Sequence, residues 1–243
     1  MTNSNVLRCT RCGRPAADSD KFCAECGLFL RDAAIDPRLL LALAHEREGR
    51  RQEARHELER LLALEPNHAL ANHFLGTHLF HEGLLEQAAA CYRKAVAAAP
   101  NFILAHYDLG VACYHRGNMP CAIEAYRRCL EIDSHYNAAH YRLALALFHN
   151  GQLGEAREHF ELARALTPEY VMASYHLGVI HERRAEYDLA AREFERALEE
   201  SNGDVSGIYH LALVRDAQGH HAAAEELRQR ARGFSKSPSV GAK

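Results

Sequence analysis

Two pairs of cysteines near the start of the chain have the residue type and spacing of a metal site. Each pair has the pattern CxxCG: Cys9 pairs with Cys12, and Cys23 pairs with Cys26. A CxxC turn directs two thiolates to one side of a tight loop. Two such turns facing each other place four sulfur atoms at the corners of a tetrahedron. Because four thiolates leave no coordination position open for substrate or water, the pattern predicts a closed structural Zn²⁺ site.

This double CxxCG pattern resembles the short zinc ribbon family over residues 6–30. The resemblance implies a small element with little β structure, whose folding free energy comes from the bound metal because so few residues bury little surface. The alternatives are a redox CxxC pair, idle thiols, or iron in place of zinc. A thioredoxin-like pair requires a βαβ context, which this sequence lacks.

Composition places the chain among ordinary globular proteins and excludes several other classes. Of its 243 residues, 25% are charged and 48% are hydrophobic, and the net charge of -3 does not favour nucleic acid or an anionic membrane. The amino terminus lacks the apolar core of a signal peptide, and no apolar run approaches the roughly 20 residues of a membrane-spanning helix. We therefore expect a cytoplasmic protein without membrane insertion.

The elements beyond the cysteines repeat with a period of 34 residues. Units beginning at residues 35, 69, 103, 137, 171 and 205 align without an insertion. Leucine occupies the seventh position of every unit and alanine the twentieth. The eighth position is always small: Ala42, Gly76, Gly110, Ala144, Gly178 and Ala212. The fifteenth is glycine in five units and Ala185 in the fifth. The twenty-fourth is bulky in the first five units: Leu58, Tyr92, Tyr126, Phe160 and Phe194.

This pattern predicts two short amphipathic helices in each unit. Small residues at the eighth and twentieth positions let paired helices approach to about 8–10 Å. Leucine at the seventh position fills the contact, and glycine at the fifteenth permits the turn between the helices. The bulky twenty-fourth residue is expected to fill the space between neighbouring units.

With these positions in register, the chain resembles the tetratricopeptide repeat (TPR) family. The resemblance implies an all-α, right-handed superhelical solenoid of six helix-turn-helix repeats over residues 35–234. The predicted repeats are 35–68, 69–102, 103–136, 137–170, 171–204 and 205–234. Residues 31–34 are a short linker after the ribbon, and residues 235–243 are expected to form a disordered tail. The sequence departs from the family at two positions. None of the six units has the large aromatic residue that the family commonly places at the fourth position, and Arg228 replaces the bulky twenty-fourth residue in the last unit.

The family resemblance also implies a concave groove, lined by the first helix of each unit, that binds extended or helical peptides. Positions two, five, nine, twelve and thirteen would face it. The fifth position supplies His73, Tyr107, Tyr141, Tyr175 and Tyr209. The twelfth supplies Phe80, Tyr114 and Phe148, and the thirteenth supplies His81, His115 and His149. Aromatic and imidazole side chains suit peptide recognition, although the tyrosines could instead pack against a neighbouring helix.

We therefore expect a non-enzymatic scaffold that binds a protein or peptide partner, since no catalytic motif occurs in the sequence. The alternative is a nucleic-acid-associated factor, in which the ribbon contacts RNA or DNA and the repeats recruit protein. An RNA-reading repeat protein is disfavoured because residues 35–234 hold 22 basic and 28 acidic residues. A second metal site among the 17 histidines is not expected, because the groove histidines are a full repeat apart. The oligomeric state is left open.

Overall fold

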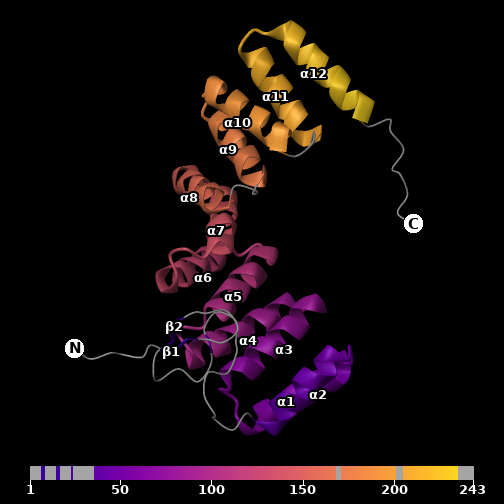
Figure 1. Cartoon of the computed structure of the whole chain (residues 1–243), viewed down its shortest axis with the longest axis vertical. Coiled ribbons are helices and arrows are strands. Elements are labelled where there is room, and N and C mark those ends of the chain that lie inside the picture. The colour runs from indigo at the N-terminus through magenta and orange to yellow at the C-terminus, as the bar shows by residue number, and fades with distance from the viewer. Residues whose placement is uncertain are drawn as a thin grey trace, which may run out of the picture. The chain divides into compact units, whose positions relative to one another are not determined.

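The computed structural model describes residues 7–8, 15–16, 23, 36–167, 171–200 and 205–234. These residues form twelve α-helices and one pair of short strands, coloured in chain order in Figure 1. The chain divides into two compact units, residues 1–139 and 140–243. The expected all-α class is confirmed for the part of the chain described.

The helices follow one another in pairs separated by short connections. The first unit contains α1 (Pro37–Arg47), α2 (Arg51–Leu64), α3 (Ala69–His81), α4 (Leu85–Ala98), α5 (Ile103–His115) and α6 (Met119–Ile132). Then come α7 (Asn137–His149), α8 (Leu153–Leu166), α9 (Val171–Arg183), α10 (Tyr187–Glu200), α11 (Val205–Ala217) and α12 (His221–Phe234). The two members pack together in five of the pairs: α1 with α2, α3 with α4, α5 with α6, α9 with α10, and α11 with α12.

Local sequence signals set the helix ends. Asp36 caps α1, because its Oδ1 accepts a hydrogen bond from the Arg38 backbone N–H at 2.7 Å, and Pro37 follows as the first helical residue. The fifteenth position of each unit takes a left-handed backbone conformation, with φ of 76° at Gly117 and 58° at Ala185. Because an L side chain is strained there, the turn explains the glycine preference and marks Ala185 as its exception.

The eighth and twenty-fourth positions meet inside three of the helix pairs, in the second, third and fifth repeats. A Cβ atom added to Gly110 would lie 2.5 Å from the Tyr126 ring, and one added to Gly178 would lie 2.7 Å from the Phe194 ring. Such distances are too short for a methyl group. The small eighth residue is therefore required by the aromatic ring that lies directly over it.

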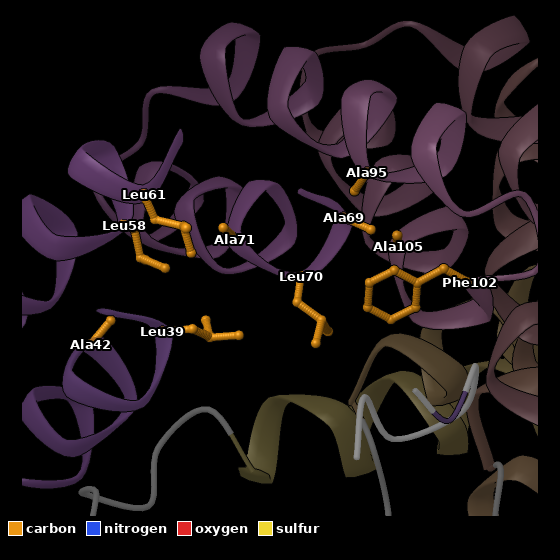
Figure 2. Close-up of a cluster of buried hydrophobic side chains, with 10 residues drawn as sticks. All are labelled: Leu39, Ala42, Leu58, Leu61, Ala69, Leu70, Ala71, Ala95, Phe102 and Ala105. Atoms are coloured by element: carbon orange, nitrogen blue, oxygen red, sulfur yellow. The ribbon is translucent and has the colours of Figure 1, made fainter. Parts of the chain in front are cut away.

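The hydrophobic core of the first unit joins successive pairs. Leu39 of α1, Leu58 and Leu61 of α2, and Leu70 of α3 are all buried in one cluster that extends to Phe102. Figure 2 shows the Leu70 side chain between Leu39 and the Phe102 ring. This continuity from pair to pair is the feature expected of stacked repeats, in which each unit buries its neighbour's apolar face.

The amino-terminal strands are short. β1 (Leu7–Arg8) pairs antiparallel with β2 (Pro15–Ala16), with Leu7 opposite Ala16. Of the four predicted zinc ligands only Cys23 is among the described residues, and it is 2% exposed. Cys9, Cys12 and Cys26 lie outside the described residues, as do the predicted linker 31–34 and the predicted tail 235–243.

None of the helices in the described ranges is long and apolar enough to cross a membrane.

Candidate functional site

The fifth-position residues contact the aromatic ring at position twenty-four of their own repeat. His73 lies 5.6 Å from Tyr92, measured between ring centroids, and Tyr141 lies 5.8 Å from Phe160. His73 is buried, with 5% of its surface exposed, whereas Tyr107, Tyr141 and Tyr175 are half-buried and Tyr209 is exposed. The half-buried tyrosines thus combine packing with a partly accessible surface.

The same fifth-position residues also reach the sixth position of the next repeat. His73 contacts Asp108 of α5, and the ring of Tyr175 lies 5.6 Å from that of His210 on α11. In the second unit the sixth-position imidazole in turn stacks on the preceding repeat's aromatic residue, as His176 does on Phe160 at 5.0 Å. The fifth and sixth positions therefore form the contact between successive first helices.

The twelfth and thirteenth positions form a more accessible row. Phe80 and Tyr114 are half-buried, while His81, His115 and His149 are exposed. The Phe80 ring on α3 meets the His115 ring on α5 at 5.6 Å in an edge-to-face arrangement. Phe148 is more buried than its counterparts, and the guanidinium of Arg183 lies 4.6 Å from its ring centroid.

A pocket of about 380 Å³ opens on the first helices of the first unit. It is lined from α1, from the start of α2, from α3 with the residue after it, and from α5: Glu46, Arg51, His73, Phe74, Thr77, His78, His81, Glu82, Leu104 and Asp108. Five of these stand at predicted groove positions: Glu46, His73, Thr77, His81 and Leu104. The structure thus brings residues from several predicted groove positions together in one open pocket.

Buried imidazoles hold two carboxylates at this pocket. His73 Nε2 is 2.7 Å from Asp108 Oδ2, and His78 Nε2 is 2.8 Å from Glu46 Oε2. The third carboxylate, Glu82, pairs with Arg55 at 2.8 Å. Sequence reasoning named His73 but missed Asp108 and His78. The register of the repeats held a signal for Asp108, because position five of one repeat contacts position six of the next.

Two polar residues at the fourth position, where the sequence departs from its family, bond to the preceding turn. Asn72 Nδ2 donates to the carbonyl of Pro66 at 2.8 Å, and His106 Nε2 donates to that of Pro100 at 2.9 Å. Burial lowers the pKa of His106 below its ordinary value, and burial likewise lowers the pKa of His176. These side chains satisfy backbone groups and have no direct role in the pocket.

Two helix cysteines, whose pairing the sequence analysis did not consider, form a bridge. Cys113 at the end of α5 and Cys121 at the start of α6 are joined by a disulfide, with their Cα atoms 5.8 Å apart. They occupy positions eleven and nineteen of the third repeat, which face each other across the turn at Gly117. Burial raises the pKa of the Cys91 thiol, which takes part in no disulfide.

A family model described as "Tetratricopeptide repeat" matches residues 39–101, 104–137, 132–170 and 141–205. MamA from Desulfovibrio magneticus RS-1 is 24% identical, with a TM-score of 0.64 over 70% of this chain and 98% of that chain. YrrB, "a TPR protein with an unusual peptide-binding site", is 18% identical, with a TM-score of 0.64 over 80% of this chain and 91% of that one. A tetratricopeptide repeat protein from Parabacteroides merdae ATCC 43184 is 19% identical, with a TM-score of 0.67 over 83% and 79%. No curated protein matches significantly.

Proposed function

The chain belongs to the tetratricopeptide repeat family, and from this premise we propose that it is a non-enzymatic adaptor whose concave face binds a segment of a partner protein. Proteins with this fold act in general as protein-interaction scaffolds. The observation that carries the proposal is the pocket on α1, α3 and α5, because it lies at positions that the family uses for ligands. Aromatic and imidazole side chains beside it, such as Phe80 and His81, offer rigid contact area with polar edges.

Site-specific crosslinking tests the proposal. A photoreactive benzoylphenylalanine at His81, which is exposed and lines the pocket, should capture one partner in cells. The control places the same group at Lys94, an exposed residue on the second helix of the same repeat. Equal capture from both positions, or none from His81, would contradict concave binding. With the captured protein purified, Phe80→Ala should weaken its binding while helicity measured by circular dichroism stays unchanged.

We also propose that Cys9, Cys12, Cys23 and Cys26 hold a structural Zn²⁺. The four thiol groups fit zinc as a donor set, and Cys23 is buried, as expected for a ligand of a closed site. The pairing of β1 with β2 supports a ribbon, since in the sequence Cys9 and Cys12 lie between these strands. When bound, the ion would link the two CxxC turns and stabilise the small fold.

Metal analysis of the purified full chain tests the zinc proposal. We expect about one equivalent of zinc, with loss of most of it in Cys9→Ser/Cys12→Ser. The matched control is Cys91→Ser, which removes a helix thiol and should keep the metal. Less than about half an equivalent in the wild type would exclude the site, and an iron content near one equivalent would replace zinc by iron.

A further inference from the structure

The pocket of the first unit combines apolar walls with an excess of carboxylates. Phe74 and Leu104 line it together with three carboxylates, and Arg51 is the one guanidinium among its lining residues. Of the carboxylates, Glu82 is already paired with Arg55. Glu46 and Asp108 are therefore the anionic groups that a ligand in this pocket would meet without competition from an arginine.

The two carboxylates are held in place by side chains from α3. His78 Nε2 lies 2.8 Å from Glu46 Oε2 of α1 on one side, and His73 is hydrogen-bonded to Asp108 of α5 on the other. Both imidazoles are more than nine-tenths buried, whereas the side chains of Glu46 and Asp108 are 47% and 28% exposed. Asp108 Oδ2 is hydrogen-bonded to His73 Nε2, and Glu46 Oε2 lies 2.8 Å from His78 Nε2. Each imidazole thus contacts one oxygen of its carboxylate, and the rest of the carboxylate group is accessible from the pocket.

The size and lining of the pocket select a particular kind of side chain. A long aliphatic stem ending in a cation can lie along apolar walls while its charged head reaches a carboxylate. Lysine and arginine have this form, and charge-assisted hydrogen bonds to carboxylates are about twice as strong as neutral ones. An acidic side chain would meet like charges, and a purely apolar one would leave the carboxylates without a counter-charge.

We propose that this pocket is a subsite for a lysine or arginine side chain on the bound segment of the partner, with Glu46 and Asp108 as its counter-charges. This inference rests on the proposed function, since it assigns the chemistry of one position in the bound peptide. Glu46 and Asp108 contact the ligand directly, whereas His73 and His78 are positioning residues.

Peptide pools test the subsite on the full chain. The probes are fluorescein-labelled random nonapeptides with one fixed central residue: lysine, arginine, norleucine or glutamate. Fluorescence anisotropy should show the lysine and arginine pools binding about tenfold more tightly than the norleucine pool, with the glutamate pool weakest. Norleucine keeps the aliphatic stem and lacks the charge, so this difference isolates the cation.

Charge-neutralising variants assign the preference to the pocket. Glu46→Gln/Asp108→Asn should remove the preference for lysine and arginine, and Glu46→Gln alone, at a half-exposed residue, should reduce it without affecting folding. The matched control Glu124→Gln/Glu131→Gln removes the same amount of charge from exposed positions on α6, and this variant should retain the preference for lysine and arginine. If norleucine binds as tightly as lysine, or the pocket variant keeps the preference, the subsite is excluded and groove binding stands. If no pool binds, both the subsite and the proposed function are contradicted.

Discussion

The interior of the helix pairs and the concave face use the same 34-residue register in opposite ways. In the interior the same contact recurs: an eighth-position glycine lies under a ring in the pairs Gly76–Tyr92, Gly110–Tyr126 and Gly178–Phe194. On the concave face the contact between positions five and six is His73 with Asp108 in one unit and Tyr175 with His210 in the other. Repetition therefore marks the residues that build the fold, and variation within the register marks the positions at which we propose that a ligand is selected.

The concave positions of the two units also differ in polarity. The first unit has the polar pocket with its imidazole–carboxylate pairs. In the second unit, Met172, Tyr209 and Leu213 occupy groove positions two, five and nine and are large exposed apolar residues. The two units therefore present side chains of different polarity at the same positions of the repeat.

A large effect is expected from the bridge inside the third repeat. Reduction of the Cys113–Cys121 disulfide should lower the free energy of unfolding by about 2–3 kcal/mol, because the reduced unfolded chain gains conformational entropy. Urea unfolding of the wild type with and without dithiothreitol measures this change. Cys113→Ala/Cys121→Ala should be insensitive to the reductant, whereas Cys91→Ala should respond as the wild type does. If dithiothreitol left the free energy of unfolding of the wild type unchanged, the disulfide would not contribute to the stability of the helix pair.

A matched pair of glycines tests the steric explanation of the eighth position. Gly110→Ala places a methyl group against the buried Tyr126 ring and should cost about 1–3 kcal/mol of unfolding free energy. Gly154→Ala on α8 has open space around the new atom and should be neutral or stabilising by up to about 1 kcal/mol. Thermal unfolding of both variants provides the measurement. Equal responses would mean that helix propensity, and not the contact with the ring, explains the glycine.

The interior could be predicted from the sequence because its contacts are short in sequence and the residues that make them recur at the same positions of successive repeats. The helix pairs, the turn at position fifteen and the cap at Asp36 all follow from residue size, backbone conformation and hydrogen-bonding capacity. The site was only partly predictable. The register places His73 on the first helix of its unit, but its bond to Asp108 depends on the side-chain conformations of two repeats. The Cys113–Cys121 bridge was missed for the same reason, since helix periodicity alone gives no distance between thiols.

Acid should weaken the interior through its buried histidines. A histidine with a lowered pKa binds fewer protons in the folded state than in the unfolded state, so stability is lost as pH falls through the ordinary value near 6.5. We expect a lower urea midpoint at pH 5.5 than at pH 7.5. His106→Asn should reduce this difference and keep the bond to the turn, because Asn72 makes that bond in the preceding repeat. His135→Asn, at an exposed position, should leave the difference unchanged. Greater stability at pH 5.5 than at pH 7.5 would contradict the destabilisation by acid that we assign to these histidines.

The smallest effect on stability is expected at the concave face. Helix α11 carries one leucine on this face and one in the interior of the helix pair, two positions apart. Leu213 is 54% exposed at the ninth position, so Leu213→Ala should change the free energy of unfolding by less than about 0.5 kcal/mol. Leu211 is 4% exposed at the seventh position, so Leu211→Ala should cost about 2–5 kcal/mol. The two substitutions remove the same atoms from the same helix, and urea unfolding compares them directly. If Leu213→Ala were as costly as Leu211→Ala, the ninth position would belong to the interior, and variation there would reflect packing and not ligand selection.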